Sequence, residues 1–394
     1  MRKIAIVLLL GTVFLMPIEE VVSIGGAVSI VRLVGVLAIL AALVSTRMRL
    51  PNPPGIVLVC LPFVLWAGAS MAWSWNLVDT AVLTGTYVAL IAWVWLLVGF
   101  FPSEREWDLV QTTYLLGCYV GLVVMLITFG IRSQLDEEVA SRVSAAGMNE
   151  NELALALGLG VVVAYHIMAI SPGIGPFRRA LAGIYLLTAP IGILLTASRT
   201  LAVGLVLAVP AMIFASRGAN ARARTALIAL ILVSILVAPF VVPDDLIQRS
   251  LGQNLETKRD TSIENRQNMW EIGLRNWAEV PAYGIGSSAY KTMTKSLVAH
   301  NSYISVLVEL GIVGAVLFVV IFYALVRLIL ATRPPHRATS IACLLFLMLS
   351  MLTLTIEATK RTWMVFAIVA AMARIAPVER RSPEEAPALE AQNA

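Results

Sequence analysis

The stretch that decides the fold runs from Ser302 to Leu330 and reads SYISVLVELGIVGAVLFVVIFYALVRLIL. Its only charged residues are Glu309 and Arg327. An α-helix rises about 1.5 Å per residue, so a run of this length can cross the roughly 30 Å of hydrocarbon in a bilayer. The residues before it, Val298-Ala299-His300-Asn301, end a long polar segment. His300 is therefore expected at a membrane surface.

The composition of the whole chain points to the same environment. Of the 394 residues, 59% are hydrophobic and 13% are charged, and the mean hydropathy is +0.85, which is far too apolar for an ordinary soluble domain. Lipid offers the backbone no hydrogen-bond partner, so the spans must be helices or a closed barrel. Their apolar runs are unbroken rather than alternating, which excludes the barrel. The sequence predicts an all-α, polytopic integral membrane protein.

About twelve apolar runs qualify as transmembrane helices, and they predict a single transmembrane domain over residues 1–394. Alternate loops of such a chain lie on the same side of the membrane, and more than half of the 29 Lys and Arg fall on the side shared by both termini. Because basic loops stay in the cytoplasm, both termini are expected inside. The predicted spans are about 4–16, 26–45, 55–73, 80–101, 108–130, 151–170, 177–196, 200–216, 223–242, 302–330, 339–356 and 361–376.

The sizeable polar segment at residues 243–300 is predicted to be a loop on the outer side. Its acidic and basic side chains balance, which gives no reason to expect nucleic acid as a partner. Thr261-Ser-Ile-Glu264 is a capping-box pattern and predicts a helix to about Ala278. Arg266, Trp270 and Trp277 fall roughly on one face of it, which predicts an amphipathic helix with its tryptophans at the lipid boundary. The tail 378–394 is predicted to be disordered and cytoplasmic.

Four groups of polar residues mark the outer ends of the predicted spans. An arginine in or beside a span is costly and usually has a partner there. Each arginine taken singly can be explained as an interfacial anchor or half of an ion pair. Four groups on one side of the membrane instead favour a shared site. The groups are Arg142 to Glu152, Thr196 to Thr200, Arg266, and His300-Asn301.

These residue types suit one kind of reaction. The planar fork of arginine binds phosphate through two charge-assisted hydrogen bonds. A histidine beside arginines has a lowered pKa, so it stays neutral and can accept a proton. A sugar that leaves a lipid diphosphate needs electrostatic stabilisation of the leaving group, whereas the acceptor alcohol needs a base. Motifs for metal-bound nucleotide sugars or for nucleotides do not occur in the sequence, so neither a metal nor a cofactor is predicted.

Four stretches also carry a family resemblance: Arg142…Gly147…Asn149-Glu150-Asn151; Thr196-Ala-Ser198-Arg199-Thr200; Asn265-Arg266…Trp270 with Pro281…Gly284-Ile285-Gly286; and His300-Asn301…Glu309-Leu310-Gly311…Gly314. In their order, spacing and topology, the chain resembles the bacterial O-antigen ligase and O-antigen polymerase superfamily. These are membrane glycosyltransferases that use glycans linked to undecaprenyl diphosphate. The pattern that begins at His300 is the most specific of the four.

The resemblance implies a metal-independent, inverting transferase in the bacterial inner membrane, with its active site and the 243–300 loop in the periplasm. It implies His300 as the catalytic base and Arg199 and Arg266 as ligands of the diphosphate. Arg142 is a weaker correspondence, because Asn-Glu-Asn follows it where many relatives have Asn-Pro-Asn. The residues with an expected structural or supporting role are Asn301, Glu309, Asn149 and Asn151, and the glycines expected to allow close helix packing are Gly311 and Gly314.

Several activities share these motifs. Ligases transfer the glycan to lipid A–core, polymerases extend a growing glycan, and a third group glycosylates proteins. The moderate outer loop and the predicted spans favour a ligase, with a polymerase as the alternative, and the lack of a large C-terminal soluble extension disfavours the protein-modifying group. A polysaccharide flippase or other transporter would need charges deep in its spans and paired halves, and only Arg32 lies inside a predicted span.

Overall fold

The computed structural model describes residues 1–22, 29–46, 50–134, 148–171, 174–215, 261–294 and 298–376, with isolated positions between 225 and 236. Within these ranges the chain forms helices and turns, without β-strands. The helices are α1 (Arg2–Leu15), η1 (Met16–Ile18), α2 (Ile30–Ser45), α3 (Gly55–Ala69), η2 (Ser70–Ala72), α4 (Leu77–Phe100), α5 (Glu104–Gln134), α6 (Glu150–Ala169), α7 (Pro176–Leu195), α8 (Arg199–Ala215), α11 (Thr261–Glu279), α12 (Ala289–Met293), α13 (Ser302–Leu330), α14 (Pro334–Met351) and α15 (Lys360–Ile375).

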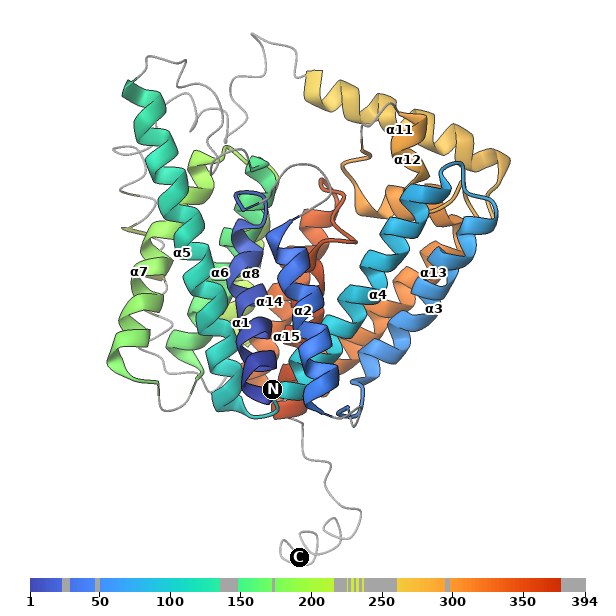
Figure 1. The fold of residues 1–394 in the computed structure, drawn as a ribbon. Helices are drawn as coiled ribbons and strands as arrows, with labels where there is room; N and C mark the ends of the chain where they lie inside the picture. The colour runs from blue at the N-terminus through green and yellow to red at the C-terminus, as the bar shows by residue number, and fades with distance from the viewer. Residues whose placement is uncertain are drawn as a thin grey trace, which may run out of the picture.

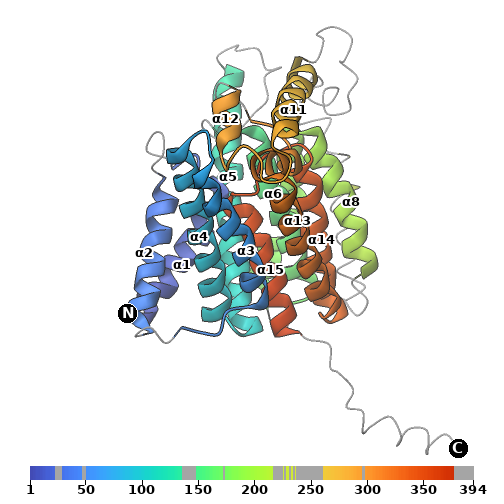
Figure 2. The same cartoon turned by 90° about the vertical axis from the view of Figure 1, so that its right-hand side faces the viewer.

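The long helices run up and down beside one another in a single bundle (Figures 1 and 2). We call the end where α1 begins and α15 ends the basal end, and the opposite end the apical end. Hydrogen bonds tie segments distant in sequence at the basal end, such as that from the Arg333 amide to the Ala376 carbonyl (2.8 Å). The helices α11 and α12 lie at the apical end. Both ends of the described chain, Met1 and Ala376, therefore lie on the basal side.

The helix α6 lies at the centre of the core, in contact with α5, α7, α8 and α14. Two glycines let aromatic rings approach its backbone: a Cβ at Gly158 would lie 2.2 Å from the Phe346 ring, and one at Gly160 would lie 2.4 Å from the Tyr185 hydroxyl. That hydroxyl donates to the Leu157 carbonyl at 3.0 Å. Small residues thus provide the close helix contacts that substitute for a hydrophobic driving force in lipid.

The helices confirm a helical membrane protein but not the predicted number of spans. Six helices in the described part are long and apolar enough to cross a bilayer, namely α4, α5, α6, α7, α13, and α3 extended through η2. Helices also occupy the other predicted spans except 223–242, which lies largely outside the described residues. The span predicted at 339–356 is displaced, because α14 begins at Pro334. Proline suits the first helical turn, where its missing N–H costs no hydrogen bond. His336 therefore lies in the first turn of α14.

The helix α13 is broken at Gly311, whose φ is 67°. Such a break exposes carbonyls and amides that must find other partners, above all within a membrane. The turn from Pro281 to Gly286 supplies them. Ile285 and Gly286 donate to the carbonyls of Val308 (3.1 Å) and Glu309 (2.9 Å), and Pro281 and Ala282 accept from the amides of Ile312 (2.9 Å) and Val313 (3.2 Å). The indole of Trp66 donates to the Leu310 carbonyl at 2.9 Å.

This contact leaves no room for a side chain at two positions. A Cβ at Gly311 would lie 2.4 Å from the Ala282 carbonyl oxygen, and one at Gly284, whose φ is 72°, would lie 2.5 Å from the Glu309 carbonyl oxygen. Gly284 and Gly311 belong to separate sequence motifs, but the same backbone contact requires both of them. Gly311 was expected to help helices pack, but it accommodates a turn inside a broken helix instead.

The predicted amphipathic helix is present as α11, which lies across the apical end of the bundle (Figure 1). The position of its two tryptophans at the lipid boundary stays a prediction, and both side chains are partly buried. Trp270 and Trp277 pack on a small hydrophobic cluster that includes Ile285, Tyr290 and Val308. The Trp270 indole N–H donates to the Ala299 carbonyl at 2.7 Å. This bond attaches α11 to the residue that precedes His300.

Candidate active site

His300 lies in the short apical segment between α12 and α13. Its backbone adopts a left-handed conformation, with φ 48°, which is uncommon for a residue other than glycine and costs of order 1–3 kcal/mol. The side chain is half-buried. Burial, and next the guanidinium charge of Arg266, lower the pKa of His300 below its ordinary 6.5. The imidazole is therefore neutral at pH 7 and can accept a proton.

Asn301 fixes the chain immediately after His300. Its side-chain oxygen accepts from the amides of Tyr303 (3.0 Å) and Ile304 (3.1 Å), which caps the first turn of α13. Its side-chain nitrogen donates to the Leu352 carbonyl at 3.2 Å. Asn301 thus holds the start of α13 against the segment that links α14 to α15, and its role in a site stays a prediction.

Arg266 lies on α11, four residues before Trp270. The bond from the Trp270 indole to the Ala299 carbonyl holds this part of α11 over the segment that carries His300. The Tyr290 hydroxyl, from α12, also donates to the Met269 carbonyl on α11. The structure therefore brings Arg266 and His300 together, and the effect of the guanidinium on the pKa of His300 reflects that proximity.

Glu309 is buried in α13, about two turns beyond the start of the helix, and contacts the start of α12. Its carboxylate accepts from the amides of Ser288 (2.7 Å) and Tyr290 (3.3 Å), which open α12. A carboxylate at a helix N-terminus satisfies free amides and offsets the helix dipole. Glu309 thus joins α13 to the start of α12, and its supporting role in the site stays a prediction.

Arg199 is the first residue of α8 and lies at the apical end with the start of α6. The two helices are joined there, because the Ser198 hydroxyl donates to the Asn151 side-chain oxygen at 2.7 Å. Asn149 caps α6 through the Asn151 amide (3.0 Å). The Asn149 amide donates in turn to Glu20 at 2.7 Å. The predicted Arg142 lies outside the described residues.

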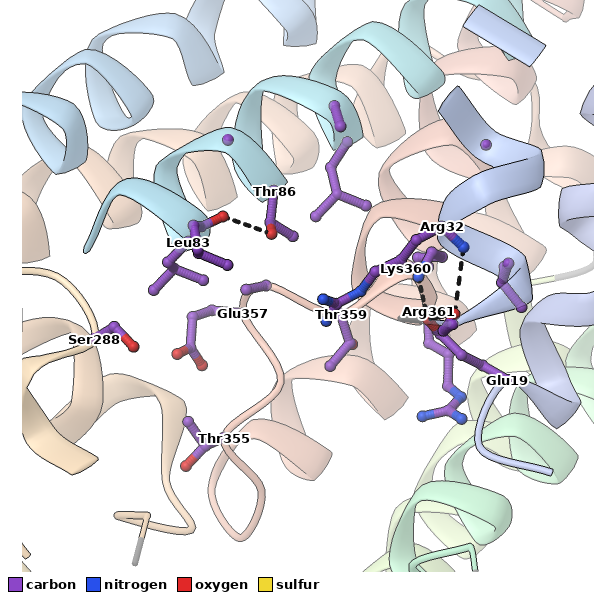
Figure 3. A pocket seen from close by; sticks show the side chains of 18 of the residues that line it. Glu19, Arg32, Leu83, Thr86, Ser288, Thr355, Glu357, Thr359, Lys360 and Arg361 are labelled. Carbon is purple, nitrogen blue, oxygen red and sulfur yellow. Dashed lines mark hydrogen bonds and ion pairs between the residues drawn. The ribbon is translucent and has the colours of Figure 1, made fainter. Parts of the chain in front are cut away.

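A cavity of about 770 Å³ opens among α1, the Glu19-Glu20 turn, α2, α4, α6, α12, α13 and the 355–361 segment (Figure 3). Among the predicted site residues, only Glu309 lines it, although the neighbours of His300, Val298 and Ala299, line it too. Many charged side chains line this cavity, which is unusual within a membrane bundle. They are Glu19, Glu20, Arg32, Asp79, Glu152, Lys291, Glu309, Glu357, Lys360 and Arg361.

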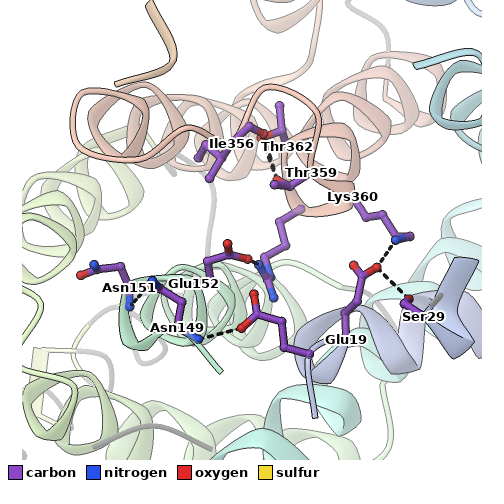
Figure 4. A network of polar contacts seen from close by, with 11 residues as sticks. Glu19, Ser29, Asn149, Asn151, Glu152, Ile356, Thr359, Lys360 and Thr362 are labelled. Atoms are coloured by element: carbon purple, nitrogen blue, oxygen red, sulfur yellow. Dashed lines mark hydrogen bonds and ion pairs between the residues drawn. The ribbon is translucent and has the colours of Figure 1, made fainter. Parts of the chain in front are cut away.

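Ion pairs hold one side of this cavity together (Figure 4). Glu19 pairs with Lys360, and Arg361 pairs with Glu152. Burial, and next the charge of Glu152, raise the pKa of Glu20 to about 7. Glu20 is therefore partly protonated near neutral pH, which reduces its repulsion with Glu152. The pairs connect the end of α1 with the starts of α6 and α15.

Of these residues, the sequence analysis placed only Glu152 in a predicted polar group, at the end of the stretch from Arg142. It assigned Glu19, Lys360 and Arg361 to no site, and it noted Arg32 only as a charge inside a predicted span. The structure places Arg32 in the first turn of α2, at the apical end and on the cavity. The available signal was that Glu19-Glu20 and Lys360-Arg361 carry opposite charges on the same predicted side of the membrane.

Together, the apolar helix bundle and the polar apical end define a multi-pass membrane protein with a buried polar site at one membrane face. Residues 184–319 match the model of a family described as O-antigen ligase. The matched region contains Arg199, Arg266, His300 and Glu309, and the match confirms the resemblance to the O-antigen ligase and polymerase superfamily. Members of this family are glycosyltransferase-like enzymes. A comparison with curated proteins finds no match to the chain.

Proposed function

We propose that this protein is an O-antigen ligase-like glycosyltransferase, which moves a glycan from undecaprenyl diphosphate to an acceptor hydroxyl. The acceptor in this proposal is lipid A–core. The observation that carries the proposal is the proximity of His300 and Arg266 inside the region that matches the family. A neutral imidazole beside a guanidinium offers a base for the acceptor and a positive charge for the leaving group.

In the proposed reaction, the acceptor hydroxyl gives its proton to His300. Its oxygen forms a bond to the anomeric carbon of the donor sugar, and the bond from that carbon to the phosphate oxygen breaks. Undecaprenyl diphosphate leaves with the electron pair. Attack on the face opposite the diphosphate inverts the anomeric configuration, and no metal takes part.

The arginines stabilise the charge on the departing diphosphate. Arg266 and Arg199 have this role in the proposal, and Arg142 is a further candidate. Both substrates are amphiphiles anchored in the bilayer, so the reaction takes place at the membrane face that holds the apical end. We assign that face to the periplasm and the basal end, with both termini, to the cytoplasm of a bacterial inner membrane.

A transfer assay tests this proposal. Purified protein in lipid nanodiscs is given the lipid-linked glycan and the lipid A–core of its host, and the product is identified by mass spectrometry. We expect a new glycosidic bond of inverted configuration, formed equally well in EDTA. If the protein moves the lipid across a bilayer without forming that bond, it is a flippase. If EDTA abolishes transfer and Mg²⁺ restores it, the metal-free reaction is wrong.

A deletion strain separates the ligase from the alternative, an O-antigen or exopolysaccharide polymerase of the same superfamily. A strain without a ligase accumulates lipid A–core that carries no polymer. A strain without a polymerase carries a single repeat on its core. Mass analysis of the lipopolysaccharide distinguishes these two results, and we expect the first.

A further inference from the structure

The peptide bond between Ala299 and His300 is held by a side chain from another helix. The φ of His300 is 48°, a strained conformation that persists only where the surroundings enforce it. The indole N–H of Trp270, on α11, donates to the Ala299 carbonyl of this peptide at 2.7 Å. Because a peptide unit is planar, a fixed carbonyl also fixes the plane from which the φ of His300 is measured. The bond from Trp270 therefore opposes relaxation of the strained residue.

The chain is also held on the other side of His300. Asn301 caps α13 with its side-chain oxygen and donates to the Leu352 carbonyl. With both neighbours fixed, His300 cannot relax unless a hydrogen bond breaks. The left-handed conformation costs about 1–3 kcal/mol, and one hydrogen bond contributes about 0.5–1.5 kcal/mol net. The two quantities are comparable, so loss of the Trp270 bond is enough to let the His300 segment change its conformation.

The ring of Trp270 is itself fixed by its neighbours. It packs on the small hydrophobic cluster that contains Ala299 and Tyr290. The Tyr290 hydroxyl, from α12, donates to the carbonyl of Met269, the residue before Trp270. Gly273 makes this approach possible, because a Cβ there would lie 2.6 Å from the same hydroxyl. The indole N–H is therefore directed at the Ala299 carbonyl by contacts on α11 and α12.

The same helix carries the charge that acts on His300. Arg266 lies four residues before Trp270, about one helical turn away, so both side chains lie on one face of α11. Burial, and next Arg266, lower the pKa of His300, and Arg266 is the charged group that contributes to this shift within the described part of the chain. One hydrogen bond from α11 thus fixes both the conformation of His300 and its proximity to a positive charge.

We propose that Trp270 is a positioning residue for the base His300. It acts through the Ala299 carbonyl: its indole N–H keeps the His300 segment in the strained conformation and beside Arg266. The importance of this position for catalysis rests on the proposed function, but the contact itself can be tested without any transfer reaction. A tryptophan that only stabilised α11 would leave the titration of His300 unchanged when its N–H is removed.

The test compares two substitutions on α11. Trp270→Phe keeps an aromatic ring in the cluster but removes the N–H donor. Trp277→Phe is the matched control, because Trp277 packs on the same cluster and its indole donates to the Pro281 carbonyl at 3.1 Å, away from the His300 segment. The pKa of His300 is measured by NMR of isotope-labelled histidine rings in the full-length protein in nanodiscs. The chain has three histidines, and His300→Ala identifies the relevant signal.

We expect Trp270→Phe to raise the pKa of His300 toward its ordinary 6.5, because the segment becomes more exposed and moves away from Arg266. Transfer per folded molecule should fall about 10- to 100-fold, as for a misplaced catalytic group, and its acidic limb should move to higher pH. Trp277→Phe should leave the pKa and transfer near wild type, and the other two histidines provide internal references. An unchanged pKa in Trp270→Phe, or an equal rise in Trp277→Phe, would overturn the proposal.

A second variant keeps the test decisive if Trp270→Phe does not fold. Tyr290→Phe removes the hydroxyl that donates to the Met269 carbonyl and leaves the indole in place. We expect it to raise the pKa of His300 in the same direction by a smaller amount. An unchanged pKa in Tyr290→Phe would overturn the proposal in that case. The proposed function fails by a different result, namely wild-type protein in which His300 titrates below 6.5 but no glycosidic bond forms.

Discussion

The two ends of the bundle hold histidines in opposite situations. At the basal end, His166 is buried and its Nδ1 lies 2.7 Å from the Thr339 hydroxyl. Its ring lies 5.3 Å from that of His336 at an interplanar angle of 49°, and the Nε2 of His336 lies 3.3 Å from Glu104. At the apical end, His300 has a left-handed backbone, is half-buried and lies beside Arg266. Neighbouring side chains fix the first histidine, whereas backbone strain and a nearby charge distinguish the second. Backbone strain that the surroundings maintain is a reason to expect function.

Removal of each imidazole gives the largest expected contrast. We expect His300→Ala to reduce glycan transfer by about 10²–10⁴-fold, the usual contribution of a general base, with little change in melting temperature. His166→Ala should instead lower the melting temperature, because it leaves a cavity in the core, while transfer per folded molecule stays near wild type. Transfer assays and thermal unfolding in detergent measure both effects. Normal turnover by His300→Ala would remove the proposed base.

Replacement of arginine by lysine tests whether the apical arginines bind the diphosphate through two directed hydrogen bonds rather than through charge alone. We expect Arg199→Lys and Arg266→Lys each to reduce transfer by about 10²–10³-fold, because a point charge cannot replace the two-pronged contact with diphosphate. Arg327→Lys, on the exposed surface toward the basal end, is the control and should transfer normally. If the apical variants bind and transfer the donor as well as this control does, Arg199 and Arg266 are only interfacial anchors.

Substitution of Gly311 tests whether the broken helix supports the apical site. We expect Gly311→Ala to lower stability by about 3 kcal/mol or more, since the new Cβ meets the Ala282 carbonyl in a left-handed backbone. Gly183→Ala on α7 is the matched control, because its Cβ meets nothing within 4 Å. Thermal unfolding of both variants provides the measurement. Equal stability of the two variants would mean that the 281–286 turn can shift to accommodate the new Cβ at little cost in free energy.

The pH dependence of transfer gives the smallest expected effect. A base works only when neutral, so transfer should rise with pH through the pKa of His300, and the acidic limb should lie below pH 6.5. Arg266→Gln removes the positive charge that lowers this pKa, so the residual activity should have its limb at a higher pH. Arg266→Lys keeps the charge and should leave the limb near its wild-type position. A wild-type limb above pH 6.5 would contradict this assignment.

The sequence predicted the local elements of this fold well, because their signals are local. Apolar runs marked the long helices, and the capping box marked α11. Contacts between distant segments left no such signal. The Pro281–Gly286 turn and the Glu309–Gly314 pattern were both noted, but nothing in their spacing indicates that one is inserted into the other. The packing of Trp270 on the 281–290 segment was not predicted for the same reason, since a tryptophan that faces lipid and one that packs on a neighbouring segment have the same helical period.

The predicted site was incomplete because hydrophobicity and charge were interpreted separately. His300 and Arg266 were predicted as partners, and the structure brings them together. The pairs of Glu19 with Lys360 and of Glu152 with Arg361 were missed, because nothing in the sequence indicates which charges on one side of the membrane lie close together. Opposite charges at the apical ends of different helices form ion pairs only when those helices lie side by side. The sequence does not specify that arrangement.

The break at Gly311 divides α13 into a short apical part that carries the His300 segment and a long basal part. The apical part is attached to the 281–286 turn by backbone hydrogen bonds, whereas the basal part meets the hydrocarbon. A helix tilts when bilayer thickness changes. We expect the break in α13 to absorb that tilt, so that His300 keeps its position relative to α11 in membranes of different thickness.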